Sequence, residues 1–246
     1  MTDAHATEAH VRPPAAGRVH RSRRRIRLSD RDPSGRLRLD AVMRFLQDAA
    51  TDDVDETGWG APEHLWVVRH ARIDVVEPVV ESGEVELLTW CSGTAALAAG
   101  RRLSLRHERA GRIEVDSVWI HLGPDARPAR IEDFDVYAGS ADGRTVSTRL
   151  DLPLPGAGAN RRPWPLRLAD LDVMGHVNNA AYWQAVEELL AGTGLGRTTL
   201  RARLDHRHPV DRDERLELAM TNDEAGVSSA FVVDGAARAV ARVECL

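Results

Sequence analysis

The sequence predicts an α+β fold made of two similar copies, each with one helix packed against a mostly antiparallel sheet. Three observations predict it: an internal repeat, one amphipathic helical segment in each repeat, and several strand-like segments after each helix. A helix and a sheet that are each apolar on one side bury those sides against each other, which gives a layered arrangement.

The internal repeat centres on an Asp-x-Asp turn. Residues 27–37 read RLSDRDPSGRL and residues 167–177 read RLADLDVMGHV, and the two align without a gap at an offset of 140. A second pair of stretches, residues 73–87 (IDVVEPVVESGEVEL) and residues 204–218 (LDHRHPVDRDERLEL), shares an aspartate, a Pro-Val pair and a Glu-Leu pair. Two ungapped matches in the same order indicate that one unit was duplicated.

The helix expected in each copy begins shortly after the turn. Residues 39–50 carry apolar side chains at a spacing of three and four residues, and residues 179–191 repeat this pattern. Asn178 stands where an N-cap belongs, because its side chain can accept a hydrogen bond from a free amide of the first turn.

Short strands and turns are expected after each helix. Ser82-Gly83 and Asp234-Gly235 are two of the turn signals that separate the strands. The strands expected in the first copy are residues 66–75, 83–90, 101–106 and 113–122, and those expected in the second are residues 199–207, 214–221, 227–233 and 237–245.

The repeat also sets the expected domain boundaries. Residues 1–20 are polar and poor in large apolar side chains, which predicts a disordered tail. We expect a first domain over residues 21–136, a linker rich in Gly, Pro and small residues over 137–162, and a second domain with the candidate site over 163–246. The two copies are expected to form a pseudo-dimer within one chain, and further pairing into a homo-oligomer stays open.

Composition and charge exclude several classes of protein. A net charge of −5 and a pI near 6.1 argue against general nucleic-acid binding. There is no apolar run of the roughly 18–20 residues that a membrane span needs, and the first ten residues lack the apolar core of a secretory signal. Two cysteines, Cys91 and Cys245, favour a reducing cytoplasm over a disulfide framework. The sequence contains no lysine, which excludes Schiff-base chemistry.

The turn of the second copy continues into a longer motif. Residues 170–182 read DLDVMGHVNNAAY, and this D-x-D-x-x-G-H-V-N-N-x-x-Y string resembles the hotdog thioesterase superfamily. The tandem arrangement resembles the acyl-acyl-carrier-protein thioesterases of bacteria and plants, which are double hotdogs, and residues 29–50 and 89–93 add to this likeness. The likeness covers about residues 20–246.

The resemblance implies both a fold and an activity. The fold is a tandem hotdog, in which each copy is a long helix wrapped by an antiparallel sheet. The activity is hydrolysis of a fatty-acyl thioester of acyl-carrier protein or coenzyme A to a free fatty acid and a thiol. No metal and no cofactor are expected.

The resemblance assigns catalytic roles to two residues. Asp172 matches the catalytic carboxylate of related hotdog thioesterases, and His176 matches the histidine of the plant enzymes. The asparagine of the plant enzymes falls on Met174, and their downstream Glu or Cys falls near Pro209 and Val210. We therefore expect a mechanism centred on Asp172 in which the wider plant-type network is incomplete.

The chemistry of thioester hydrolysis fits this short stretch. The carboxylate of Asp172 can act as a nucleophile or as a general base for water. Free amides at a helix start carry partial positive charge, and we expect those of residues 175–177 to stabilise the developing oxyanion. The candidate oxyanion or substrate-positioning residues are Gly175, Val177, Asn178, Asn179 and Tyr182.

Each of these candidates also has a structural interpretation. Asp172 can cap its turn through an Asx hydrogen bond. His176 can make a structural hydrogen bond in place of a catalytic one. The pattern favours helix caps for Asn178 and Asn179, and a place in the core for Tyr182.

The first copy repeats the aspartate but not its surroundings. Asp32 mirrors Asp172, whereas Arg36 replaces the histidine and Leu39 replaces the second asparagine. We interpret Asp32 as part of a degenerate second site that shapes the acyl pocket, and a second working carboxylate is the alternative. His206 and His208 alternate along a strand, but without a zinc-type partner set an exposed strand is favoured over a metal site.

Two other functions remain open at the level of sequence. One is a dehydratase or enoyl hydratase on the same fold, which the D-x-D-x-x-G-H-V-N-N string does not resemble. The other is a non-catalytic acyl-CoA sensor or binding module, against which the retention of Asp172 argues.

Overall fold

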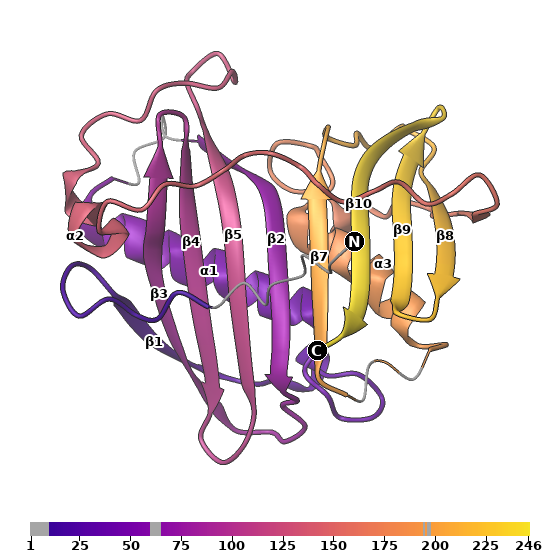
Figure 1. The fold of residues 1–246 in the computed structure, drawn as a ribbon, viewed down its shortest axis with the longest axis horizontal. Helices are drawn as coiled ribbons and strands as arrows, with labels where there is room; N and C mark the ends of the chain where they lie inside the picture. Colours follow the sequence, from indigo (N-terminus) through magenta and orange to yellow (C-terminus); the bar gives the residue numbers. More distant parts are fainter. Residues whose placement is uncertain (1–9, 60–64, 194, 196–197) are drawn as a thin grey trace, which may run out of the picture.

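The computed structural model describes residues 10–59, 65–193, 195 and 198–246. Within these residues, ten strands form one antiparallel sheet, and two long helices lie behind it in the view of Figure 1. The helices are α1 (Leu39–Thr57) and α3 (Asn179–Leu190). The strands are β1 (His20–Arg25), β2 (Leu65–Glu77), β3 (Glu84–Ala95), β4 (Ala98–His107), β5 (Arg112–Leu122), β6 (Asn160–Pro163), β7 (Leu200–His206), β8 (Glu217–Asp223), β9 (Gly226–Val233) and β10 (Ala236–Cys245).

The order of the strands reveals the duplication. The sheet runs β1-β3-β4-β5-β2-β7-β10-β9-β8-β6, so the second copy repeats the first in the reverse direction across the β2–β7 junction. At this junction Arg72 lies opposite Arg203, and these two residues hold equivalent positions in the repeat. The two copies are therefore related by a pseudo-two-fold axis through the middle of one continuous sheet.

The predicted elements are present, with differences at their ends. Helix α1 continues to Thr57 and ends at Gly58, whose φ of 72° is a left-handed conformation that favours glycine. Strand β3 extends to Ala95 because its hairpin with β4 continues to the Ala95–Ala98 pair. Strand β8 begins at Glu217, later than expected, because a turn and an irregular stretch precede it.

The core lies between the sheet and the two helices. The predicted apolar stripe of α1 is buried, and α3 buries Trp183 and Val186. These side chains belong to one continuous apolar cluster that also includes strand residues of both copies. Because α1 and α3 also contact each other, the two copies share a single core, and neither copy's helix is covered by its own strands alone.

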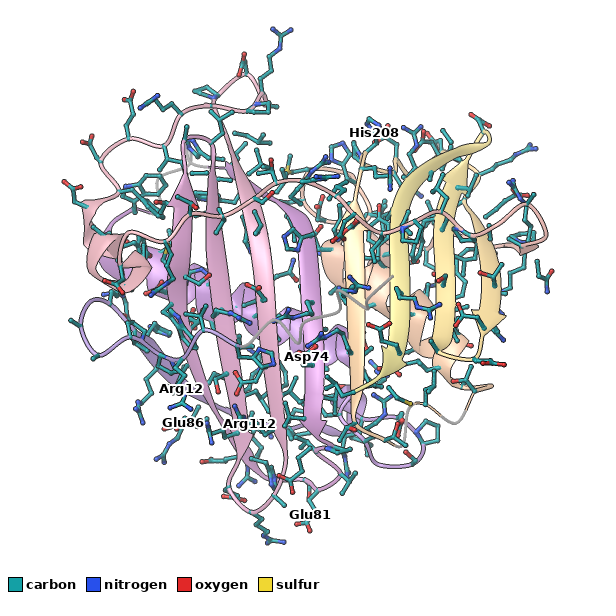
Figure 2. The ribbon with its side chains drawn as sticks, viewed as in Figure 1. Arg12, Asp74, Glu81, Glu86, Arg112 and His208 are labelled. Atoms are coloured by element: carbon teal, nitrogen blue, oxygen red, sulfur yellow. The ribbon has the colours of Figure 1, made fainter. Side chains whose placement is uncertain are left out.

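The face of the sheet without long helices is covered by connecting segments. Residues 1–9 of the expected tail lie outside the described residues, whereas residues 10–19 lead into β1 and contact the protein. The imidazole Nε2 of His10 lies 2.9 Å from Asp74 Oδ2, and Arg18 Nε donates to Asp53 Oδ1 at 2.5 Å. Figure 2 shows Asp74 near the middle of the sheet. The expected disorder therefore does not extend to residues 10–20, because these ion pairs hold them.

The linker crosses the same face of the sheet, in front of β2 and β7 in Figure 1. The expected span of 137–162 includes the short helix α2 (Ala138–Ala141) and the first residues of β6. Leu152 is buried in a small apolar cluster with residues of β8, β9 and β10, and its amide donates to Asp205 Oδ2 at 3.0 Å. The linker is thus packed along the sheet between its two ends.

Candidate active site at the Asp172 turn

The first aspartate of the motif has a structural role. Asp170 ends the short 3₁₀ helix η3 (Leu168–Asp170), and its side chain is buried. Its carboxylate accepts hydrogen bonds from the amide of Arg167 at 2.8 Å and from the guanidinium of Arg167 at 2.6 and 3.1 Å. The carboxylate of Asp170 is fully occupied in holding the start of the turn.

The second aspartate, Asp172, uses one oxygen for the turn and leaves the other open. Its Oδ1 accepts from the amides of Met174 at 2.9 Å and His176 at 3.2 Å. Gly175 closes the turn with a left-handed φ of 82°, and its amide donates to the Asp172 carbonyl. Among the described residues, none donates to Oδ2 of Asp172. The Asx cap that we considered as an alternative is therefore present, and it still leaves one carboxylate oxygen for chemistry.

His176 is paired with a carboxylate that the sequence analysis missed. Its Nε2 lies 3.3 Å from Oδ1 of Asp211, and the backbones of these two residues form an isolated antiparallel bridge. The two side chains are 37% and 64% exposed. The sequence comparison aligned the downstream catalytic residue of the plant enzymes near Pro209 and Val210, but Val210 is buried in the core, and the acidic residue is Asp211, one position later.

The amides that we expected to bind an oxyanion are not free. The amide of Gly175 donates to the Asp172 carbonyl, that of His176 to Asp172 Oδ1, and that of Val177 to the Val210 carbonyl. This expectation is wrong for these three amides because the turn satisfies them internally. A ligand at Gly175 or Val177 would have to displace an existing hydrogen bond.

One amide at the helix start does remain available. Asn178 is the N-cap of α3, as predicted: its Oδ1 accepts from the amide of Ala180 at 2.8 Å, and its own amide donates to the Asp170 carbonyl. Asn179 is the first residue of α3, and among the described residues its amide has no acceptor. The positive end of the helix dipole therefore presents this single N–H group.

Asp172 and Asn179 line the same cavity, which has a volume of about 460 Å³. This volume falls in the usual range for small-molecule sites, about 300–1,000 Å³. The first copy supplies most of the walls, from α1 and from β2 to β5. The other lining residues are Gln47, Ala50, Thr51, Val54, Asp55, Trp66, Cys91, Ala99, Gly100, Arg101, Trp119, Phe134 and Val173.

The cavity follows α1 away from Asp172. Its α1 lining runs from Gln47 to Asp55, a length of roughly 12 Å at 1.5 Å per residue. Arg101, which also lines the cavity, donates to the buried carboxylate of Asp53 at 2.7 Å. The Asp172 turn therefore lines a mainly apolar space with aromatic walls, whose lining also includes the paired guanidinium of Arg101.

Tyr182 belongs to the core, as its structural interpretation predicted. Its side chain is buried, and its ring packs edge-on against Phe231 and His206 with centroids 5.0 Å apart in each case. Burial raises the pKa of its hydroxyl group. Tyr182 does not line the cavity, so the structure offers no contact through which it would position a ligand there.

The histidines of β7 are not arranged as a metal site. His206 packs against Tyr182, whereas His208 is exposed just beyond the end of β7 (Figure 2). In the described part of the chain, no group of three or more His, Cys, Asp or Glu side chains is placed to hold a metal ion. Among the same residues, no helix is long and apolar enough to cross a membrane.

The Asp32 turn repeats the geometry of the Asp172 turn with a different outcome. Asp32 Oδ1 accepts from the amides of Ser34 at 2.8 Å and Arg36 at 3.0 Å, as Asp172 Oδ1 does from Met174 and His176. However, Arg36 Nε also donates to Asp32 Oδ2 at 3.1 Å. Burial raises the pKa of Asp32, but the hydrogen bonds from Ser34 and the charge of Arg36 outweigh this and lower it. Both oxygens of this carboxylate are occupied.

The opposite copy closes the Asp32 turn further. Arg36 is buried, and its guanidinium also donates to Oε2 of Glu187 on α3. Oε1 of the same Glu187 accepts from the amide of Leu39 at 2.6 Å. Leu39 is the first residue of α1, so the amide equivalent to that of Asn179 is already bonded.

Comparison with known proteins identifies the family. The sequence pattern of the acyl-ACP thioesterase N-terminal domain matches residues 17–139, and that of the C-terminal domain matches residues 157–244. An uncharacterized protein of Mycobacterium tuberculosis is 28% identical over 236 residues, which cover 95% of this chain and 94% of that protein.

Solved structures share the fold over almost the whole chain. The 12:0-ACP thioesterase from Umbellularia californica superposes with a TM-score of 0.76 at 21% identity, covering 92% of this chain and 96% of that one. An acyl-ACP thioesterase from Bacteroides thetaiotaomicron superposes with a TM-score of 0.78 at 15% identity, covering 92% and 97%. With both halves of the chain matched, this double-hotdog protein belongs to the acyl-ACP thioesterase family and hydrolyses fatty-acyl thioesters.

Proposed function

We propose that the chain hydrolyses acyl-ACP thioesters at the Asp172 turn, with Asp172 as the general base. One observation carries this proposal: Asp172 and Asn179 line one largely apolar cavity, and within the described part of the chain one carboxylate oxygen of Asp172 and the amide of Asn179 have no hydrogen-bond partner. Thioester hydrolysis requires these two groups, one to activate water and one to bind the oxyanion.

The reaction would proceed in two steps. Asp172 removes a proton from a water molecule as the water oxygen attacks the carbonyl carbon, and the negative charge that forms on the carbonyl oxygen is stabilised by the Asn179 amide. The tetrahedral intermediate then collapses, the carbon–sulfur bond breaks, and the thiolate leaves. The proton held by Asp172 then passes to the thiolate. His176, which pairs with Asp211, does not line the cavity and is assigned no step.

Direct attack by Asp172 on the carbonyl is the alternative chemistry at the same site. It forms a mixed anhydride between the enzyme and the acyl group, which water then cleaves. A single turnover in ¹⁸O-labelled water tests for this alternative. Label in the Asp172 carboxylate would demonstrate the anhydride, since general-base catalysis and cleavage of the anhydride at the acyl carbonyl both place the label in the fatty acid.

The carrier-protein form of the substrate is part of the proposal. The matched family is described by acyl-ACP thioesters, and two structures that share the fold are named for the same substrate class. Values of kcat/KM for one acyl chain on acyl-carrier protein and on coenzyme A test this, and a preference for coenzyme A would contradict it. We also propose a cytoplasmic location, because Cys91 and Cys245 are free thiols, which a reducing compartment maintains.

The deciding experiment is thiol release from a panel of acyl-ACP and acyl-CoA thioesters from C4 to C18, with wild type and Asp172→Asn. We expect wild type to turn over several chain lengths and the variant to lose about a hundredfold or more in kcat, the scale of acid–base catalysis. Asparagine retains the Asx cap, so thermal unfolding of the two proteins should coincide. Tight acyl-CoA binding by both without turnover would instead indicate a binding module.

A further inference from the structure

Gln47 and Glu187 occupy the same position in the two copies. They lie 140 residues apart, the offset that relates Asp32 to Asp172 and Leu39 to Asn179. Each lies on the long helix of its own copy, and α1 and α3 contact each other across the pseudo-two-fold axis. Glu187 therefore faces the Asp32 turn, and Gln47 faces the Asp172 turn.

Glu187 shows what a side chain at this position can reach. One of its oxygens accepts from the first amide of α1, at Leu39, at 2.6 Å, and the other accepts from Arg36, the counterpart of His176. A carboxylate at this place thus binds both the helix-start amide and the residue four positions after the aspartate. In doing so it fills the position that a substrate carbonyl would occupy in an open site.

Gln47 is at the corresponding place but makes none of these bonds. Its side chain is half-buried and lines the cavity together with Asp172 and Asn179. Among the described residues, the Gln47 carboxamide has no hydrogen-bond partner, while the Gln47 main-chain carbonyl accepts from the hydroxyl of Thr51 at 3.0 Å. An uncharged carboxamide with a free donor and a free acceptor therefore points into the site from the opposite copy.

We propose that Gln47 is a further residue of the catalytic site, contributed by the first copy, which orients the attacking water. Its Oε1 accepts a hydrogen bond from the water, while its Nε2 donates toward the open Oδ2 of Asp172. Among the described residues Gln47 makes no hydrogen bond to the Asn179 amide and so leaves it for the carbonyl oxygen, whereas Glu187 binds the Leu39 amide. The inference rests on the proposed function of the Asp172 turn.

The test uses Gln47→Ala and Gln47→Glu on the full chain. The alanine variant loses the water contact, so we expect kcat to fall by about tenfold to a hundredfold, below the hundredfold or greater loss typical of removing an oxyanion donor. KM should change by less than about threefold, since the acyl chain still binds in the same cavity. Asp48→Asn is the matched control, because Asp48 is the adjacent residue on α1 but is exposed and outside the cavity lining.

Gln47→Glu provides a readout that a structural role would not give. At neutral pH the introduced carboxylate should capture the Asn179 amide, as Glu187 captures the Leu39 amide, and kcat should fall further than in Gln47→Ala. Protonation of that carboxylate releases the amide, so kcat relative to wild type should recover as pH is lowered toward the pKa of a glutamate, about 4–5. The wild-type rate should instead fall with pH, because its base is a carboxylate.

Three outcomes decide the matter. Folded Gln47 variants that keep kcat within about twofold of wild type would overturn the role of Gln47 and leave the function of Asp172 intact. A Gln47→Glu variant whose pH profile parallels that of wild type would overturn the amide-capture argument. An Asp172→Asn variant that keeps the kcat of wild type would overturn the proposed site and the role of Gln47 with it.

Discussion

The turns that carry Asp172 and Asp32 share the same main-chain framework. In each, the aspartate Oδ1 accepts from amides two and four residues later, the aspartate amide donates to the carbonyl four residues later, and a glycine with positive φ closes the turn. They differ in the residue four positions after the aspartate, which is Arg36 in one turn and His176 in the other. They differ again in the helix residue that faces them, Glu187 or Gln47.

The difference shows that an aspartate in this motif has two separable roles. The hydrogen bonds through Oδ1 fold the turn, and both copies keep them. The proposed chemistry uses Oδ2 and the first amide of the helix, and the Arg36–Glu187 pair binds both of these in the first copy. In the first copy the groups equivalent to the proposed reactive ones are therefore hydrogen-bonded within the protein, and this copy provides most of the cavity walls.

Breaking the Arg36–Glu187 pair is expected to give the largest loss of stability. The two side chains are only 4% and 12% exposed. Arg36→Met leaves the carboxylates of Asp32 and Glu187 together without a cation, and removing one partner of a buried pair costs about 3 kcal/mol or more. His176→Met, the matched change in the other turn, should cost less than about 1 kcal/mol, because the His176–Asp211 pair is exposed.

Urea unfolding of wild type and both variants measures the two free energies of unfolding at pH 7. Equal losses for Arg36→Met and His176→Met would contradict the burial of the Arg36–Glu187 pair and the exposure of the His176–Asp211 pair.

The contrast also shows what the sequence could and could not predict. Helix and strand positions follow from local periodicity, so α1, α3 and the eight longer strands were found to within a few residues except at the late start of β8 and the ends of α1 and β3. The Asp172–Asn179 segment could be singled out as the candidate site because its motif is contiguous in the sequence.

The missed features all depend on residues far apart in the chain. Gln47 meets the Asp172 turn only through the pseudo-two-fold axis, and Arg36 meets Glu187 in the same way. Asp211 reaches His176 through a bridge of strand-like backbone. The error about the amides of residues 175–177 has a different cause: a sequence shows that a turn begins a helix, but not which internal acceptors its amides find.

A second difference between the copies concerns pH. His206 in β7 occupies the position of Val75 in β2. Burial, with smaller effects from His70 and Arg69, lowers the pKa of His206 to about 3. In the unfolded chain a histidine has a pKa near 6.5, so below that pH the unfolded state binds a proton that the folded state does not bind until about pH 3. Stability should therefore fall as pH decreases from 6.5 toward 3.

His206→Val copies the residue of the first copy and should remove this dependence. Proton uptake by His206 in the unfolded state should lower the free energy of unfolding of wild type by about 2 kcal/mol at pH 5 relative to pH 8. The variant should therefore lose about 2 kcal/mol less than wild type between pH 8 and pH 5, as measured by urea unfolding at the two pH values. Parallel losses in both proteins would mean that His206 is protonated in the folded state.

Asp32→Asn is expected to have the smallest effect. It also tests most directly whether the first copy takes part in catalysis. Asparagine keeps the Asx cap but loses the charged contact to Arg36, and Arg36 keeps its ion pair with Glu187. The free energy of unfolding should therefore fall by about 1 kcal/mol near neutral pH. The pKa of Asp32 is lowered in the folded state, so its stabilisation is present above its unfolded pKa, near 4, and is lost as pH falls below that value. The unfolding free energies of wild type and Asp32→Asn should therefore converge below about pH 4, and kcat at neutral pH should stay within about threefold, since no reacting group is touched. A loss of kcat that matches that of Asp172→Asn would show instead that the first copy carries a second working carboxylate, and that the Arg36–Glu187 pair opens during turnover.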